Sequence, residues 1–245
     1  MGTYSISIRP FGVHAILIEW PNRVEETILD DILQFTKFLK SECLKNENWE
    51  IVPAYNSLTL IHRDKPIAFK EFKKKLEIWY SEKREIGVGE KYLWRLPVCY
   101  DLEFGIDFSS VSQQLNKSIE EIISLHTENI YTLYGIGFLP GFMYLGGLPK
   151  ELEVPRLSEP RAKVLKGSVG LAGKQTGIYP QESPGGWNII GSCSVPMFNP
   201  QKNEPCFISV GDKVQFYQIE RAEYDLHKIE GEVGIYKVEK VKLDA

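Results

Sequence analysis

The chain has 245 residues, of which 43% are hydrophobic and 25% are charged, and this composition is typical of a globular protein that buries a core. A net charge of −4 and a pI near 5.7 give no general attraction to phosphate backbones, so nucleic acid is not an expected partner. No apolar run approaches the roughly 20 residues that span a bilayer, and the N-terminus lacks a signal-peptide pattern, so we expect a cytoplasmic protein without membrane contact.

The first 88 residues predict a small α/β domain. Strand and helix patterns alternate along them, at residues 13–20, 22–40, 57–63 and from 69 onward. This order predicts a sandwich in which helices cover one side of a sheet. The glycine-containing segment Ile86–Glu90 is expected to join it to a second domain, residues 89–245.

The second domain is expected to be rich in short strands, with one helical insertion. Asp107 can cap a short helix that Asn116 ends, and Ser118 with Glu121 matches a capping box that opens a second helix. Strand patterns broken by Gly and Pro lie at residues 131–137, 167–173, 176–180, 187–191, 206–210, 213–219 and 232–241. They predict a β-barrel or barrel-like sandwich, so we expect the whole chain to be α+β.

Two glycine-rich stretches invite a nucleotide-binding interpretation that their residues do not support. The stretch GSVGLAGKQT has Gln175 where a P-loop needs a hydroxyl, and Ser168 where the loop needs its first glycine. In GIGFLPG the third glycine comes one residue late for a dinucleotide fingerprint, and Pro140 would interrupt a helix. The four cysteines form no C-x-x-C pair and the four histidines are scattered, so no metal site is expected.

His126 shares the apolar face of the capped helix with Ile119, Ile122 and Ile123. A lone histidine in such a place is usually a core residue with satisfied hydrogen bonds, and the alternative is a general acid or base. Nine residues later begins GIGFLPGFMYLGGLP, whose glycines are out of register for a phosphate loop and which is too short for a membrane hairpin. We interpret this stretch, residues 135–149, as the wall of a binding site.

The motifs from HTENIY through IGFLPGFMYLGGLP, VPRLSEPR and KGSVGLAGKQTGIYPQESPGGWNIIG to GDKVQF resemble the KipI family. Its members are described as the B subunit of 5-oxoprolinase, as allophanate hydrolase subunit 1-like proteins and as inhibitors of a sporulation histidine kinase. The likeness begins at AILIEW and extends over most of the chain. It implies a small N-terminal α/β domain, residues 1–88, followed by a cyclophilin-like β-barrel, residues 89–245.

The resemblance implies the B subunit of an ATP-dependent 5-oxoprolinase, which converts 5-oxo-L-proline to L-glutamate together with a carboxyltransferase-like C subunit and an A subunit. ATP is used by the complex, and the sequence does not locate its site. Two other functions stay open. One is a binding module that inhibits a sensor histidine kinase, and the other is a component of a urea carboxylase or allophanate hydrolase-type enzyme.

The residue types in these motifs suit the processing of a small amide. His126 is a candidate acid or base, and Gln175 can hydrogen-bond an amide or satisfy the backbone of a turn. Arg161 and Arg156 can pair with a carboxylate or phosphoryl group, or form a salt bridge that holds a loop. The remaining candidates for substrate binding are Phe138, Tyr179, Gly185, Gly186 and Trp187.

The chain departs from the wording of the family at two places. Leu157 and Ser192 stand where basic residues are frequent in its members. Fewer cationic groups near the site favour a contribution from a partner protein to any phosphate binding.

Overall fold

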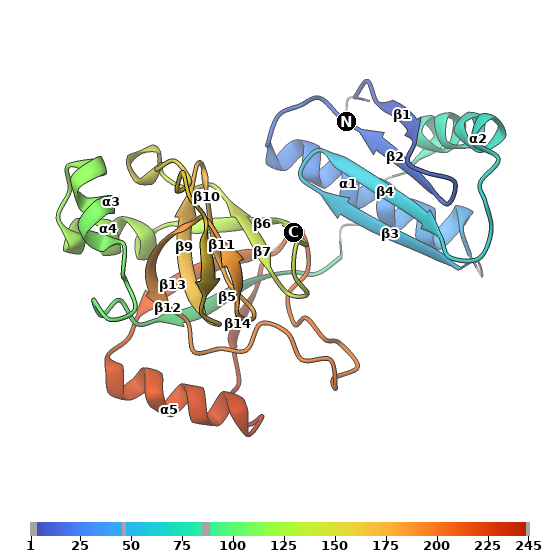
Figure 1. Ribbon diagram of the computed structural model, residues 1–245. Coiled ribbons are helices and arrows are strands. Elements are labelled where there is room, and N and C mark those ends of the chain that lie inside the picture. The colour runs from blue at the N-terminus through green and yellow to red at the C-terminus, as the bar shows by residue number, and fades with distance from the viewer. Residues whose placement is uncertain (1–3, 46–47, 85–88, 244–245) are drawn as a thin grey trace. The chain divides into compact units, whose positions relative to one another are not determined.

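The computed structural model describes residues 4–45, 48–84 and 89–243, and the chain divides into two compact units, Met1–Glu90 and Lys91–Asp244 (Figure 1). The joint expected at Ile86–Glu90 lies mostly outside the described residues. The second unit starts at Lys91 instead of the expected residue 89. No helix in the described ranges combines the length and the apolar character needed to cross a membrane.

The first unit is a four-stranded antiparallel sheet, in the order β1-β2-β4-β3, with two α-helices, of which the first continues into a short π-helix, η1 (Leu39–Cys43). Its elements are β1 (Ser7–Pro10), β2 (Ala15–Glu19), α1 (Glu26–Phe38), β3 (Trp49–Ala54), β4 (Ser57–His62) and α2 (Phe69–Glu82). Alternate residues of the central strands, among them Ile16 and Leu60, share one core with both helices, so the helices cover one face of the sheet. The predicted helices and central strands are confirmed. The edge strands β1 and β3 were missed, and their residues are mostly exposed in β1 and half-buried in β3.

The helical insertion of the second unit consists of α3 (Phe108–Leu115) and α4 (Ile119–Glu128). Asn116 ends α3 in the left-handed conformation, with a φ of 51°. Ser118 and Glu121 form the predicted capping box, with donor–acceptor distances of 3.1 and 2.7 Å. Asp107 is the N-cap residue of α3, as predicted, but its carboxylate accepts no hydrogen bond from the helix and is bound by other groups described below.

The second unit is built on a strongly curved eight-stranded sheet, in the order β12-β9-β10-β7-β6-β13-β5-β14 (Figure 1). Its strands are β5 (Lys91–Val98), β6 (Ile130–Ile136), β7 (Met143–Gly146), β9 (Ser168–Ala172), β10 (Gln175–Ile178), β12 (Asn188–Ser192), β13 (Lys213–Gln218) and β14 (Glu239–Leu243). β13 is parallel to β5, and all other pairs are antiparallel. Cys99, directly after β5, exchanges two 2.9 Å backbone hydrogen bonds with Ser192 and so links β5 to β12 at one point.

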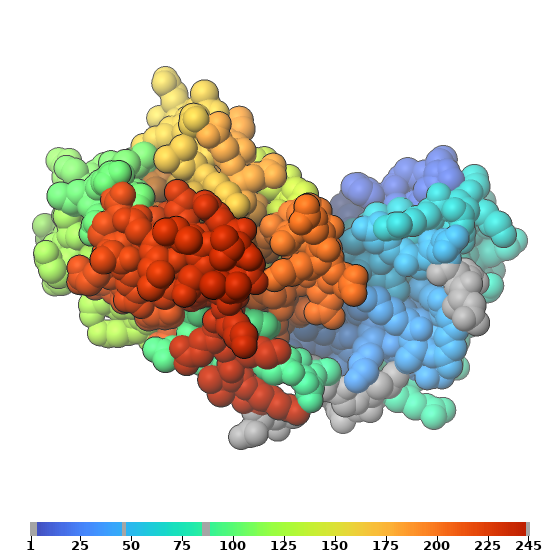
Figure 2. Space-filling view, turned by 90° about the horizontal axis from the view of Figure 1, so that it is seen from below, coloured from blue at the N-terminus to red at the C-terminus, as the bar shows by residue number. Residues whose placement is uncertain are grey.

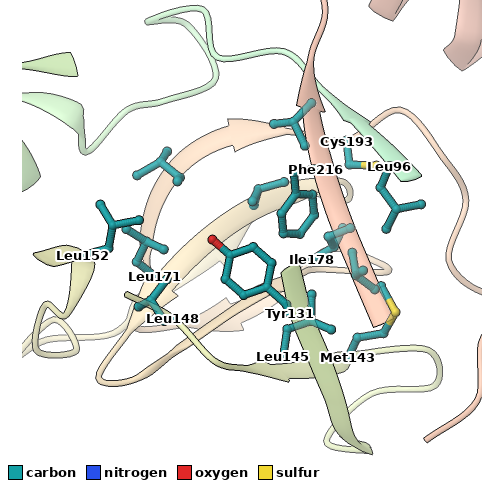
Figure 3. Packing of buried hydrophobic residues seen from close by; sticks show 14 of the residues in the cluster. Leu96, Tyr131, Met143, Leu145, Leu148, Leu152, Leu171, Ile178, Cys193 and Phe216 are labelled. Carbon is teal, nitrogen blue, oxygen red and sulfur yellow. The ribbon is translucent and has the colours of Figure 1, made fainter. Parts of the chain in front are cut away.

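The main core fills the inside of this curved sheet (Figure 3). Leu96, Tyr131, Leu145, Leu171 and Phe216 come from five different strands and are buried together. β8 (Arg161–Val164) and β11 (Ser183–Gly185) form a separate two-stranded ribbon. The α+β class is confirmed.

Two predictions near the C-terminus need correction. Residues 206–210 form no strand, although Ile208 is buried, because the chain turns there into Asp212. The predicted strand at 232–241 is real only in its last residues, where β14 begins. The helix α5 (Arg221–Glu232) before it was missed, because its only fully buried apolar side chain is Tyr224.

Candidate functional site

His126 lies inside the core of the second unit and has no exposed surface. Its Nδ1 is 2.7 Å from the Tyr100 hydroxyl, its Nε2 is 2.9 Å from the Thr176 hydroxyl, and its ring stacks on Phe216 at 4.6 Å. Burial lowers the pKa of His126 to about 3, so the ring is neutral at pH 7. Both nitrogens are occupied, as in a core histidine with satisfied hydrogen bonds.

Gln175 is the first residue of β10 and lies directly before Thr176. Successive side chains of a strand point to opposite faces, so Gln175 points away from the core that Thr176 shares with His126. The turn before it is close to the loop that carries Arg156, because the Gly173 N–H donates a 2.6 Å hydrogen bond to the carbonyl of Val154. The structure therefore separates His126 from Gln175, although the two are linked through Thr176.

The predicted arginines and glycines come together around the β8–β11 ribbon. Arg161 pairs in register with Gly185, and the Leu157 N–H donates a 2.8 Å hydrogen bond to the carbonyl of Gly186. A Cβ atom on Gly185 would lie 2.3 Å from the hydroxyl of Tyr179, so only glycine fits there. These residues, far apart in the sequence, form one surface region of the second unit.

The aromatic residues of this region form a packed layer. Tyr179 and Trp187 are buried, and both rings pack edge-on against Phe142, at 5.2 and 5.3 Å. They therefore form the buried base of the region, and their rings present no open surface to a ligand.

Phe138 is the exposed aromatic member, with 66% of its surface accessible. Its φ of 68° is an unusual conformation for a bulky residue. Such strained residues cluster at functional sites.

Arg156 is exposed above this layer and interacts electrostatically with Tyr144 and Tyr179. Burial raises the pKa of both tyrosines, and the positive charge of Arg156 acts in the opposite direction. Its guanidinium therefore lies at the edge of the aromatic layer, within reach of a ligand from solvent.

Arg161 forms a salt bridge with Asp107, with 2.5 Å between Nη2 and Oδ1. The other carboxylate oxygen of Asp107 accepts a 2.6 Å hydrogen bond from the Ile189 N–H, so the pair ties β8 to the start of α3 and to β12. Within the described part of the chain, Nη1 of Arg161 is buried and has no acceptor. Arg161 therefore forms the loop-holding salt bridge that was one of its two expected roles, and its Nη1 makes no hydrogen bond within the described chain.

Arg161 also lines a cleft of about 420 Å³ beside α5. The cleft lies between residues 103–106, residues 161–168 and α5, and its volume is within the range of small-molecule sites. Figure 2 shows α5 (red) on the face of the unit where these parts meet. The charged residues of the lining are Arg161, Lys163, Lys166, Lys228, Glu103 and Glu182.

Ser192 lines the same cleft, and its hydroxyl is 2.9 Å from the hydroxyl of Tyr224 on α5. The sequence suggested a shortage of cationic groups near this residue. Four cationic side chains line the same cleft as Ser192, and one of them, Lys228, comes from the unpredicted helix α5. The sequence analysis did not name Lys166 or Lys228 as site residues. Lys166 could have been found, because it begins the family motif KGSVG, whereas Lys228 lies in no motif.

Comparison with known proteins places this architecture in a family. Residues 6–208 match the family described as carboxyltransferase domain, subdomain C and D. A protein of Bacillus subtilis (strain 168), named as the B subunit of 5-oxoprolinase, is 34% identical over 93% of this chain and 99% of its own length. A protein of Haemophilus influenzae with the same name is 36% identical, over 86% of this chain and 97% of its own length.

The chain belongs to the family of 5-oxoprolinase B subunits. The family resemblance drawn from its motifs is thereby confirmed.

Solved structures agree with this family membership. The protein TTHA0988 superposes with a TM-score of 0.74 at 30% identity, over 85% of this chain and 41% of that longer chain. The urea carboxylase of Kluyveromyces lactis superposes with a TM-score of 0.80, over 98% of this chain and 24% of its own, at 15% identity. The second likeness shows a shared fold only.

Proposed function

We propose that the chain is the B subunit of a cytoplasmic, ATP-dependent 5-oxoprolinase complex, which opens 5-oxo-L-proline to L-glutamate with its C and A subunits. The observation that carries this proposal is the similarity to the Bacillus subtilis protein of that name, which extends over 99% of its length. A match over the whole length favours a shared role over a shared fold alone.

The chemistry explains why such a complex would need ATP. The lactam of 5-oxoproline is an unstrained amide, and its carbonyl carbon is a poor electrophile. Transfer of the γ-phosphoryl group of ATP to the amide oxygen releases ADP and activates that carbon. One water then adds to that carbon and the C–N bond breaks, which leaves γ-glutamyl phosphate. A second water hydrolyses this acyl phosphate to glutamate and phosphate.

The surface region around the β8–β11 ribbon offers the groups that this substrate needs. Arg156 and Arg161 supply guanidinium donors for a carboxylate or a phosphoryl group. Gln175 begins β10 on the outer face of the sheet and can hydrogen-bond the amide. Phe138 presents an exposed ring for the apolar edge of the lactam, above the buried base of Tyr179 and Trp187.

His126 has a different role in this proposal. Its contacts to Tyr100 and Thr176 hold β10 against α4, and Thr176 is the neighbour of Gln175. His126 is therefore a positioning residue, and it acts on the substrate through the strand that carries Gln175.

The presence of a partner protein is supported by an apolar face on α5. Leu226, Ile229 and Val233 are 54%, 60% and 65% exposed and lie opposite the buried Tyr224 on the helix. The outer side of this helix is open in Figure 2. A row of large apolar side chains in water is typical of a protein interface, and we assign it to the carboxyltransferase-like C subunit.

The same apolar face keeps a second candidate function open. An inhibitor of a sensor histidine kinase needs an exposed apolar patch and no catalysis. The two candidate functions differ in the protein that would cover this apolar face, a C subunit or a histidine kinase, and only the first requires ATP hydrolysis by the complex.

The test is to purify the chain with candidate C and A subunits and to measure glutamate formation from 5-oxoproline and ATP. We expect turnover only when all three proteins and ATP are present. No turnover with all three present would refute the proposed function, and equal turnover without this chain would show that it is dispensable.

A further inference from the structure

We propose that the cleft beside α5 is a binding site for a phosphoryl group, held by Lys166 and Lys228. The proposal deepens the proposed function and rests on it for its biological meaning. The binding itself is a property of the isolated chain, so it can be tested without partner proteins.

The charges of the cleft do not balance. Lys163 is paired with Glu182 at 2.7 Å, Arg161 with Asp107 at 2.5 Å, and Glu103 with Arg221 at 2.6 Å. In the described ranges no carboxylate lies within ion-pair distance of Lys166 or Lys228, so two positive charges of the lining remain uncompensated. Cationic groups in a concave surface attract an anion more strongly than the same groups on a flat one.

The two lysines come from two different segments that line the cleft. Lys166 lies two residues after the end of β8 and directly before the buried Gly167. Lys228 lies one helical turn after Tyr224 on α5, and the contact of Tyr224 with Ser192 fixes that helix to the end of β12. Lys166 and Lys228 are both exposed, and both line the cleft, so their ammonium groups are accessible to a ligand there.

Arg161 gives the second, independent observation. Arg161 is one of the residues that line the cleft, and its buried Nη1 has no acceptor in the described chain. A buried donor without a partner is rare in native proteins, and a bound ion or water is a common explanation. Arg161 therefore adds a third cationic group to this wall of the cleft, and one of its donors is not used within the described chain.

The shape of the surface also accommodates more than the anion. A smaller hollow of about 90 Å³ adjoins the cleft and shares Lys166, Tyr224 and Lys228 with it. Its other lining includes Val195 and Met197 and one carboxylate residue, Glu232, so a phosphoryl group between the lysines could carry a mainly apolar substituent into that hollow. Two uncompensated ammonium groups match the double charge of a phosphoryl group better than the single charge of a carboxylate.

The experiment is a titration of the full chain with inorganic phosphate, at an ionic strength held constant with chloride, followed by NMR or calorimetry. A parallel titration with acetate separates a phosphoryl site from a carboxylate site. The double variant Lys166→Gln/Lys228→Gln removes both ammonium groups. The matched control is Lys150→Gln/Lys202→Gln, which makes the same charge change at exposed positions outside the cleft.

We expect saturable phosphate binding that is roughly tenfold tighter than acetate binding, roughly tenfold weaker in the double variant and unchanged in the control. Unsaturable binding by the wild type, or equal binding by the double variant, would overturn the site. Equal affinity for acetate would overturn the phosphoryl assignment. Phosphate binding by a chain whose complex makes no glutamate would leave this proposal standing while the proposed function fails.

Discussion

Two polar regions of the second unit differ in how completely their groups are paired. In the core, both ring nitrogens of His126 have hydroxyl partners, and the ring is packed on Phe216. In the cleft, Lys166 and Lys228 have no carboxylate partner in the described chain, and Arg161 keeps one donor without an acceptor. A completely paired polar cluster stabilises one structure, whereas incompletely paired charges are available to a ligand.

The core side of this comparison predicts the largest effect. His126→Ala should lower the free energy of unfolding by about 3 kcal/mol, because it leaves a cavity and removes the partner of the Tyr100 and Thr176 hydroxyls. Chemical denaturation measures the change. Ser124→Ala, on the exposed side of the same helix, is the control and should change stability by less than about 0.5 kcal/mol. Equal stability of the two variants would contradict the packing described for the ring.

The salt bridge at the cleft wall should have a smaller effect on stability. Arg161→Ala should destabilise the chain by about 2 kcal/mol, because the buried carboxylate of Asp107 loses its counter-charge. Asp107→Ala and the double variant complete a cycle, and we expect a coupling energy of at least about 1 kcal/mol. Additive effects would mean that the two side chains do not interact.

Stability should depend on pH through His126. The folded ring accepts a proton only near pH 3, whereas the unfolded ring accepts one near its ordinary pKa of 6.5. Between these values the unfolded state binds more protons, so stability is full above pH 6.5 and is lost as the pH falls, by up to about 1.4 kcal/mol per pH unit.

His126→Gln should flatten that part of the pH profile. Denaturation curves of the variant and the wild type, compared at several pH values, isolate this contribution from those of other groups. If the stability of the variant and of the wild type changed with pH in the same way, His126 would have the same pKa in the folded and the unfolded state.

The smallest effect is expected on the open side of the cleft. Lys163 and Glu182 form an ion pair whose side chains are 62% and 55% exposed. Lys163→Gln should therefore change the free energy of unfolding by less than about 0.5 kcal/mol. A larger loss would indicate that the charges of the cleft stabilise the fold, which would contradict the contrast between the core cluster and the cleft.

The sequence could predict what depends on neighbouring residues. The capping box at Ser118, the left-handed Asn116 and the apolar face with His126 are local patterns, and each has the predicted place. The first-unit helices have strong apolar stripes for the same reason.

The sequence could not predict what depends on tertiary contacts. The carboxylate of Asp107 was expected to cap a helix, but Arg161 and the Ile189 N–H hold it instead. Gln175 and Thr176 are neighbours, yet the alternation of β10 sends them to opposite faces. The cleft joins three segments that are distant in sequence, and one of them, α5, presents its apolar residues to solvent.

The most direct test compares the two regions in one assay, as glutamate formed per assembled complex at a temperature where each variant is folded. If Arg161 contacts the substrate and His126 only positions β10, Arg161→Ala should lose roughly 100-fold in turnover and His126→Gln less than about tenfold. A complex that keeps wild-type turnover with Arg161→Ala, or one that is inactive with a well-folded His126→Gln, would contradict this assignment.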